Sequence, residues 1–347
     1  MKLITTASYY GTGSSAVTDL LSEYSNVKAL NSNFECRFAY DMFGLSDLEY
    51  YLVDNHRRHN SSTAINMFMR LMGIYGLDRK IRLESYDSYF GDSFAKAVDD
   101  YIKRLAPFSY KGGSHVDIYM KSDTSIMVLK LKDRLYHLFH RFNLTIDDTT
   151  WASKGITPYE REIHKSKCFI SYPRTDFINA TQEFTSALFD GACENDTDYL
   201  MVDQLVPPSN TTRYLRYFKD LYVICVDRDP RDVYYNEKKY WKGGIVPEDA
   251  KLFVEWYKAT RSHKKYEIDD PKRILRINFE DLVFTYEDSV KMIEELLGID
   301  CSKHVNAKLS FNPEISVNNI GKWKNDKEEF DNISYIEEHL CDMYNMK

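Results

Sequence analysis

The sequence predicts an α/β fold in which a central parallel sheet is flanked by helices. Apolar runs that suit buried parallel strands recur along the chain, as in "LYVICVD" from Leu221, and helical patterns alternate with them. The 347 residues, 43% of them hydrophobic, are enough to bury a sizeable core. We expect a single domain over residues 1–347, with a largely helical insertion at 62–173.

The chain begins with the pattern of a strand, a loop and a helix. "KLITTA" from Lys2 has strand character, and apolar residues then recur from Ala16 to Tyr24 at the spacing of one helical face. "VKALN" from Val27 is the next expected strand. Helical patterns dominate from about Ser62 to Phe108, for example in "STAINMFMRLMGIYG".

The alternation of strands and helices returns in the second half. "KDRLYHLFHRF" predicts a helix within the insertion, and "DYLMVDQ", "LYVICVD" and "RILRINFEDL" predict strands. "YEDSVKMIEELLGID" predicts a helix with Gly298 as its C-cap, and a last helix is expected from Asn332 as its N-cap. Ligands of such folds bind beyond the carboxyl ends of the strands, so we expect the site in the loops after Ala7 and Asp227.

Composition argues against several classes of protein. The net charge of −7 argues against a general nucleic-acid binder and against a protein that binds anionic membranes. The six cysteines lack the spacing of metal ligands, which favours a reducing compartment and no structural metal. Neither a signal peptide nor a run of about 18 apolar residues is present, so we expect a cytoplasmic protein without a transmembrane segment.

The loop "GTGSSA", from Gly11 to Ala16, suggests a nucleotide site but fits two familiar motifs poorly. A Walker A loop requires a lysine where Ser14 stands. The dinucleotide fingerprint is satisfied by Gly11, Gly13 and Ala16. However, the strand that follows ends in Asn31 and not in the acidic residue that would bind the ribose.

A third interpretation needs only a phosphate or sulfate at the N-terminus of the helix. Free backbone N–H groups and the positive end of the helix dipole favour an anion there. Gly11 and Gly13 let the backbone approach the anion, and Thr12, Ser14 and Ser15 offer hydroxyl groups. This interpretation accepts the absent lysine most easily, but it leaves most of the ligand's charge to be met elsewhere.

A second anion-binding element follows the buried strand at Leu221. Arg228 comes directly after this strand, where its guanidinium can grip a phosphate with two hydrogen bonds. Asp229 suits the cap of the next helix and Pro230 its first turn. Asn236 lies about two helical turns beyond Arg228 and can point toward the same ligand.

Four stretches, in order and spacing, resemble the sulfotransferases that use 3′-phosphoadenosine 5′-phosphosulfate (PAPS). They are "GTGSSAVTDLL" from Gly11, "VICVDRDPRDVYYN" from Val223, "RINFEDLVFTYEDSVKMIEELLGI" from Arg276 and "NIGKWKN" from Asn319. The similarity spans nearly the whole chain, and its specific parts are the two nucleotide-binding loops and the C-terminal segment. The resemblance implies a P-loop-NTPase-like form of the α/β fold and a nucleotide cosubstrate without a required metal.

The resemblance also implies roles for particular residues. The loop residues Gly11, Thr12, Gly13, Ser14, Ser15 and Ala16 would hold the 5′-phosphosulfate, and Arg228 would bind the 3′-phosphate. Asn236 stands where the family usually has serine. Lys322, Trp323 and Lys324 match the family's GxWK segment near the nucleotide, and on chemical grounds they can supply positive charge and an aromatic face.

One departure from the family concerns the positive charge of the first loop. The family normally has lysine or arginine where this chain has Gly11. Another cation must then neutralise the sulfuryl oxygens or the departing phosphate, and Lys130, Lys132, Lys238 and Lys239 are the candidates. The chain therefore resembles a divergent member of the family.

Sulfuryl transfer to a hydroxyl also needs a base that accepts the hydroxyl proton. We choose Glu35, because several carbohydrate sulfotransferases resemble this pattern in having a glutamate just after the second strand. Arg37 can orient Glu35 or reach an anionic acceptor. Histidine is the base in another branch of the family, which keeps five histidines as alternatives, namely His56, His59 and His115 and, less favoured, His137 and His140.

The sequence thus predicts a bacterial, cytoplasmic sulfotransferase that transfers a sulfuryl group from PAPS to a carbohydrate or glycolipid. A kinase-like P-loop phosphotransferase is one alternative, against which the missing Walker lysine and the lack of a clear acidic strand end for Mg²⁺ both count. A dehydrogenase is weakened by Asn31. A non-catalytic nucleotide-binding or scaffold protein of the same fold is the alternative from another class, and the missing loop lysine is its best argument.

Overall fold

The computed structural model describes residues 1–30, 35–73, 86, 90–91, 93–112, 121–142, 157, 166–192 and 197–344. The chain separates into two compact units. The first unit comprises Met1–Asp41, Ser88–Gly91 and Thr185–Lys347, and the second comprises Met42–Asp87 and Asp92–Phe184. In these ranges no helix has the length and apolar character needed to cross a membrane.

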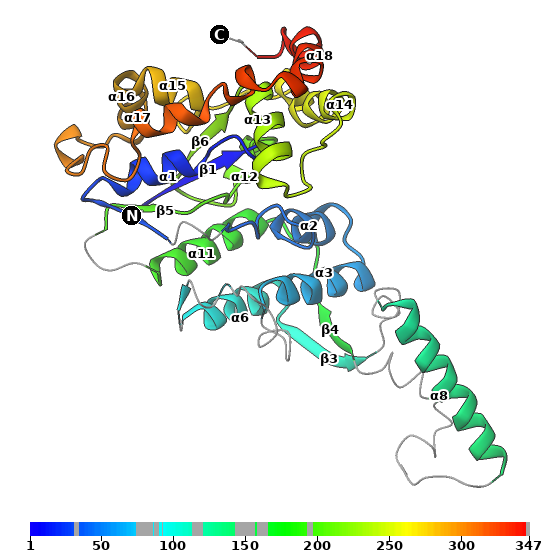
Figure 1. Ribbon diagram of the computed structural model, residues 1–347. Helices are drawn as coiled ribbons and strands as arrows, with labels where there is room; N and C mark the ends of the chain where they lie inside the picture. The colour runs from blue at the N-terminus through cyan, green and yellow to red at the C-terminus, as the bar shows by residue number, and fades with distance from the viewer. Residues whose placement is uncertain are drawn as a thin grey trace. The chain divides into compact units, whose positions relative to one another are not determined.

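The first unit contains a five-stranded parallel sheet (Figure 1). Its order is β2-β5-β1-β6-β7, and its strands are β1 (Lys2–Ser8), β2 (Val27–Ala29), β5 (Tyr199–Met201), β6 (Leu221–Asp227) and β7 (Ile274–Asn278). The long register between β1 and β6 pairs Leu3 with Leu221 and Ser8 with Val226. The loops that follow these two strands therefore leave the sheet at the same edge and next to each other.

Helices of the first unit follow the strands in alternation. They are α1 (Ser15–Ser22), α12 (Thr211–Leu215), α13 (Pro230–Asn236), α14 (Ala250–Arg261), α15 (Phe279–Phe284), α16 (Tyr286–Leu297), α17 (Pro313–Ser316) and α18 (Phe330–Leu340). The predicted α/β class, with a central parallel sheet flanked by helices, is confirmed.

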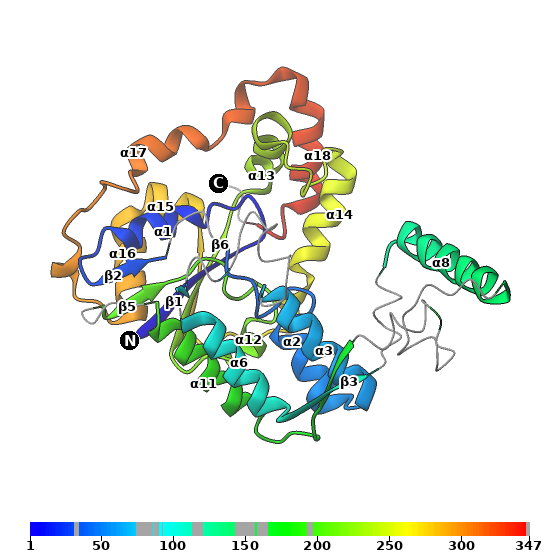
Figure 2. The same cartoon turned by 90° about the horizontal axis from the view of Figure 1, so that it is seen from below.

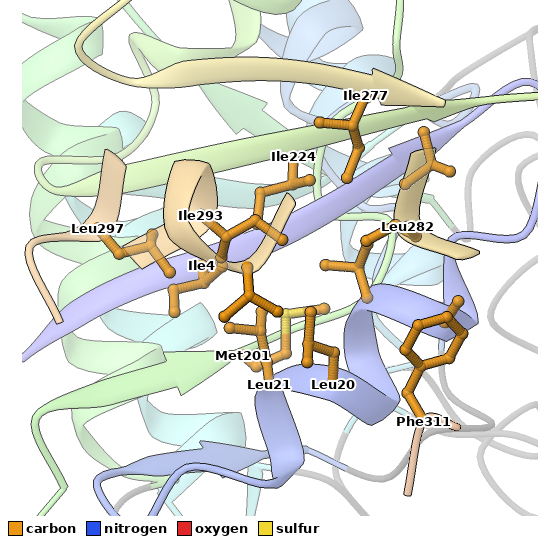
Figure 3. Close-up of a cluster of buried hydrophobic side chains, with 14 of the residues drawn as sticks. Ile4, Leu20, Leu21, Met201, Ile224, Ile277, Leu282, Ile293, Leu297 and Phe311 are labelled. Carbon is orange, nitrogen blue, oxygen red and sulfur yellow. The ribbon is translucent and has the colours of Figure 1, made fainter. Parts of the chain in front are cut away.

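One apolar cluster of this unit joins the sheet to α1, α15 and α16 (Figure 3). Ile4 and Ile224 from the sheet meet Leu20 and Ile293 from the helices, and all four are almost completely buried. Burial of a side chain of this size contributes about 1.5–3 kcal/mol. This packing holds α1 against the sheet and so fixes the loop that precedes it.

A second apolar cluster joins α13, α14 and α18, which lie side by side in Figure 2. Val233 and Tyr234 of α13 pack with Phe253 of α14 and Ile336 of α18. The cluster fixes α13, the helix that begins just after Arg228.

The second unit is mostly helical with one antiparallel strand pair. Its elements are α2 (Leu45–Glu49), α3 (Arg58–Leu71), α6 (Ser93–Leu105), β3 (Phe108–Gly112), α8 (Asp123–Arg141), β4 (Ser166–Ile170) and α11 (Phe177–Asp190), whose last turns belong to the first unit. Tyr101 and Phe184 stack at 4.4 Å between ring centres, and the Tyr101 hydroxyl shares a hydrogen bond with Thr181 at 2.7 Å. That this unit binds the acceptor stays a prediction.

Two of the three helix caps predicted from the sequence are confirmed. Gly298 ends α16 in the left-handed conformation, with φ of 69°, and Asp229 caps α13 by accepting from the Arg231 N–H. The predicted N-cap Asn332 is wrong, because α18 starts at Phe330. A preceding 3-10 turn at Lys327–Glu329 carries the chain into the helix earlier, and the Asn332 side chain instead donates to Glu329 at 2.8 Å.

Candidate functional site

The loop between β1 and α1 is shaped by two glycines and two aromatic rings. Gly11 and Gly13 have φ of 68° and 88°, the left-handed region that favours glycine. A Cβ atom at Gly11 would lie 2.6 Å from Cζ3 of Trp241, and one at Gly13 would lie 2.7 Å from Cδ2 of Phe279. Only glycine fits at either position without displacing a ring.

The N–H groups of Gly11 to Ser15 form what we call the anion cradle. Within the part of the chain that the structure describes, none of these five groups donates to another protein atom, whereas the N–H of Ala16 donates to Gly13 at 3.1 Å. The cradle lies at the N-terminus of α1, where the helix dipole also favours negative charge. A phosphate or sulfate group is the ligand that this arrangement suits.

Among the hydroxyl groups of the loop, that of Thr12 holds the loop in place, whereas that of Ser15 is exposed and can contact a ligand. Thr12 is buried, and its Oγ1 donates to the Val226 carbonyl at 2.7 Å, which ties the loop to β6. The Ser14 hydroxyl accepts from the Gln204 amide at 3.1 Å. Ser15 is exposed, and Ala16 packs into the core. The structure thus uses Thr12 and Ala16 to hold the loop in place.

Arg228 is buried at the end of β6 and still has an unpartnered group. One terminal nitrogen donates to the Asn319 carbonyl at 2.5 Å, while Nε is buried without a hydrogen-bond partner among the described residues. Burial lowers the pKa of Arg228, and the nearby carboxylates of Asp232 and Glu280 oppose this effect. A buried N–H without a partner is costly, so the structure is suited to an anion at this point.

Phe279 joins the cradle to Arg228. Its ring lies under Gly13, and the Arg228 guanidinium carbon lies 4.5 Å from the ring centre. Phe279 is not among the site residues predicted from the sequence, although its position directly after β7 places it at the same sheet edge. One ring therefore brings the two predicted anion-binding elements together.

The C-terminal segment "NIGKWK" docks on α13 beside Arg228. Asn319 accepts from Arg228 through its carbonyl and from Lys322 Nζ through its side chain, the latter at 3.0 Å. The Gly321 N–H donates to Asp232 at 2.8 Å. Lys322 also lies 4.6 Å from the ring centre of Tyr240. The predicted grouping of Arg228 with Lys322 therefore has a structural basis in Asn319.

The neighbouring predicted residues face other partners. The Trp323 ring packs under the Arg231 guanidinium at 4.6 Å and joins the cluster of α13, α14 and α18, while Lys324 Nζ lies 5.5 Å from the same ring. Asn236 is buried at the end of α13. These contacts give Trp323 a packing role in the structure.

Two of the four candidate cations, Lys238 and Lys239 of the first unit, are paired with acidic residues. Lys238 donates to Glu329 at 2.9 Å, and Lys239 pairs with Asp326 at 3.1 Å. Lys130 and Lys132 are exposed residues of α8, in the second unit. Positive charge at the base of the loop comes instead from other residues.

Asp227, the last residue of β6, forms ion pairs with two other cations. Arg261 and Lys264 approach its carboxylate at 2.7 and 2.9 Å. Burial by itself would raise the pKa of Asp227, but the two cations outweigh it and hold the pKa below its usual value. The same cations lie 4.2 and 5.4 Å from the ring centre of Tyr9, where the loop begins. Two cations therefore face the Asp227 carboxylate where the loop begins.

Glu35, the predicted base, is exposed and forms an ion pair with Arg37 at 3.1 Å. Arg37 also approaches Asp41 at 3.4 Å. Both residues belong to the first unit, as does the cradle. The role of Glu35 as base stays a prediction, and its ion pair with Arg37 matches one of the two roles predicted for Arg37.

The histidine alternatives belong to the second unit. His56 shares hydrogen bonds with Ser171 at 3.1 and 3.2 Å, and His59 lies against Arg58. His137 is exposed on α8, which also contains His140. His115 and Asn31 lie outside the described residues.

Two residues at the end of β5 were missed in the sequence. Asp203 accepts from the Thr6 hydroxyl, and Gln204 donates to Ser8 at 2.7 Å and to Ser14 at 3.1 Å. The expectation that no strand ends in a clear acidic residue for Mg²⁺ stays a prediction. Asp203 lies two residues beyond β5 and Asp227 ends β6, but Asp227 is paired with Arg261 and Lys264, and the described residues contain no cluster of side chains that could hold a metal ion. The signal was present in "YLMVDQ", where an aspartate follows an apolar run.

Comparisons with known proteins complete the description of the site. No protein-family model matches the sequence, and no curated protein matches it. A solved retinol dehydratase in complex with androsterone and inactive cofactor PAP is similar at 15% identity and a TM-score of 0.35, over 99% of this chain and 83% of that chain. A sulfotransferase from Mycobacterium tuberculosis is similar at 10% identity and a TM-score of 0.32, over 92% and 76%.

Proposed function

We propose that the protein is a sulfotransferase that uses PAPS as sulfuryl donor. The observation that carries the proposal is the pairing of two anion-binding elements through one ring, since Phe279 contacts both Gly13 of the cradle and Arg228. A nucleotide with phosphate groups at two separate positions matches two such elements better than a single phosphate does. The order of motifs that resemble this family in the sequence supports the same assignment.

In this proposal each element has a defined task. The N–H groups of the cradle would bind the 5′-phosphosulfate and stabilise negative charge on the departing phosphate, which is the main electrostatic demand of such a transfer. The unpartnered Nε of Arg228 would complete its hydrogen bonds with the 3′-phosphate. The cations Arg261 and Lys264 at the base of the loop would supply long-range positive potential in place of a loop lysine.

The acceptor and the base complete the proposal. We propose a carbohydrate or glycolipid acceptor, for which exposed rings near the cradle such as Trp241 offer a stacking face. A carboxylate would accept the hydroxyl proton, and Glu35 is the one the sequence suggests. The five described cysteines are free, in keeping with a cytoplasmic location.

Asp203 gives some support to a second candidate, a P-loop phosphotransferase. An acidic residue beyond the strand next to β1, bonded to a β1 hydroxyl, is where such enzymes hold Mg²⁺. The lysine that such enzymes place in the loop is absent. The two candidates differ in their nucleotide, because a phosphotransferase requires ATP with Mg²⁺.

Calorimetric titration of the full chain tests the proposal. We expect adenosine 3′,5′-bisphosphate to bind without added metal and more tightly than ATP with Mg²⁺. Arg228→Lys keeps the charge but removes the two-pronged hydrogen bonding, so it should weaken binding by about 1.5–3 kcal/mol, or roughly ten- to a hundredfold. Incubation with PAPS and a glycan panel then tests transfer.

Arg216→Lys is the matched control, because it makes the same change at an exposed arginine of the same unit. Its affinity should equal that of the original chain. Unchanged affinity in Arg228→Lys, or preference for ATP with Mg²⁺, would contradict the proposal. Tight binding of the bisphosphate without transfer to any glycan would favour a non-catalytic nucleotide-binding protein.

A further inference from the structure

Helix α8 has a wide apolar face that is open to solvent. Seven apolar side chains in this helix or directly after it are exposed, namely Met127, Val128, Leu131, Leu135, Leu138, Phe139 and Phe142. With about 100° of rotation per residue, they fall within an arc of about 120° on the helix. The half-buried residues Ile126, Leu129 and Tyr136 lie on the opposite side. The exposed face is therefore not the side that the rest of the chain covers.

Positive charges flank this face on both edges. The same helical geometry places Lys132 at one edge and Lys130, Arg134 and Arg141 at the other, and all four residues are exposed. These four residues against two aspartates give α8 a net charge of +2 with its histidines neutral, although the whole chain has −7. The charge of the whole chain, which argues against anionic membranes, thus conceals a local basic surface.

We propose that α8 binds the surface of a membrane that contains anionic lipids. A helix with a wide apolar face and basic edges lies in the membrane interface, where its apolar side chains enter the acyl region and its cations reach the headgroups. Anionic headgroups attract these cations. The charged residues of α8 suit this orientation and not a crossing of the bilayer. Such binding is independent of the nucleotide that the first unit is proposed to bind.

A second copy of the chain fits this face less well than an anionic membrane does. From Val128 to Phe142 apolar residues recur at alternating intervals of three and four, which is also the spacing of a coiled coil. However, Met127 and Phe139 widen the face beyond the narrow seam of a coiled coil. The charged residues next to that seam are all positive, so two copies would bring like charges together.

Sedimentation of the full chain with lipid vesicles tests this proposal. The vesicles contain either phosphatidylcholine alone or equal parts of phosphatidylcholine and phosphatidylglycerol, and the bound fraction is measured against lipid concentration. We expect the protein to bind the anionic vesicles at least about tenfold more tightly, because several cations meet a negative surface. High salt should remove most of this difference, because it screens the attraction.

One substitution removes part of the apolar face. Leu131→Ser should weaken binding to the anionic vesicles about tenfold, because it deletes an apolar side chain from the middle of the face. Leu252→Ser is the matched control, because it makes the same change at an exposed leucine of α14 in the first unit. It should bind the vesicles as the original chain does. Circular dichroism spectra that match the original chain show that each variant is folded.

A double substitution removes part of the charge. Arg134→Gln with Arg141→Gln should lose most of the preference for anionic vesicles. Lys251→Gln with Lys303→Gln removes two exposed positive charges from the first unit and should retain that preference.

Several results would overturn the membrane proposal. They are equal binding to both kinds of vesicle, binding to neither, and unchanged binding of Leu131→Ser to the anionic vesicles. A dimer in analytical ultracentrifugation that Leu131→Ser dissociates would also overturn it, because the face would then belong to a second copy. None of these results bears on the proposed sulfotransferase, which is tested separately by the binding of adenosine 3′,5′-bisphosphate.

Discussion

Gly11 shows at the scale of one residue why this loop has no lysine. Its backbone is left-handed, and the Trp241 ring fills the space into which a side chain would extend. Trp241 ends a π-helical turn at Glu237–Trp241, and the Gly244 N–H donates to Glu237 at 2.8 Å, which fastens the segment that follows. The aromatic ring thus fills the space that a side chain at position 11 would need.

Introducing the missing cation should therefore not improve the site. Gly11→Lys should lower the free energy of unfolding by about 1–3 kcal/mol, because it strains the backbone and displaces the ring. Trp241→Ala combined with Gly11→Lys should cost less than the sum of the two single changes. Chemical denaturation of the four proteins in a double-mutant cycle measures this coupling. A strictly additive result would contradict the packing argument.

At the scale of elements, α15 is short but connects much of the site. Its first residue, Phe279, contacts the cradle and Arg228, and Glu280 accepts from the Asp229 N–H at 3.1 Å. Leu282 packs into the core beneath α1. The helix therefore sets the spacing between the loops that follow β1 and β6.

Phe279→Ala should destabilise the protein by about 3–5 kcal/mol, because it leaves a cavity between the loops. In conditions where it remains folded, its affinity for adenosine 3′,5′-bisphosphate should also fall. Phe284→Ala is the control, because it removes the same ring from the other end of α15, where the ring is 61% exposed. That change should alter the free energy of unfolding by no more than about 0.5 kcal/mol. Equal effects of the two substitutions would refute the bridging role.

At the scale of the whole molecule, the carboxyl edge of the sheet gathers charges of both signs. Burial raises the pKa of both Asp203 and Asp232 to about 6, against an ordinary value of 3.8. At these two carboxyl groups the folded chain consequently binds more protons than the unfolded chain between about pH 4 and pH 6. In this interval these two groups make stability fall as the pH rises.

This predicts a pH-dependent stability difference between the original chain and Asp203→Asn. Above about pH 7 the substitution should stabilise the protein by up to roughly 3 kcal/mol, because it removes a carboxylate whose burial is unfavourable. The advantage should shrink as the pH falls through 6 and vanish near pH 4. Urea denaturation of both proteins at pH 4, 5, 6, 7 and 8 measures it. An advantage that grows toward low pH would contradict the raised pKa.

Features that depend on residues close together in the sequence could be predicted, whereas contacts between distant residues could not. The strands, α1, the Asp229 cap and the Gly298 cap follow from periodicity and from residues within one turn, so they could be predicted. The contacts of Gly11 with Trp241 and of Arg228 with Asn319 join residues far apart in the chain. No local pattern specifies such pairings. The same holds for the hydrogen bonds that Asp203 and Gln204, beyond β5, form with the first loop and β1. The candidate site was therefore predicted in its anchors and missed in the residues that join them.

The contact between Arg228 and Asn319 also bears on how the protein is made. Synthesis proceeds from the N-terminus, so the cradle leaves the ribosome long before Asn319 and Gly321 can complete the surroundings of Arg228 and Asp232. Until then Arg228 stays only partly enclosed and its neighbouring helix α13 lacks α18 as a packing partner. A nascent or truncated chain that ends before this segment has both anion-binding loops but lacks the Asn319 and Gly321 contacts. The surroundings of Arg228 and Asp232 are therefore complete only in chains that extend past Gly321.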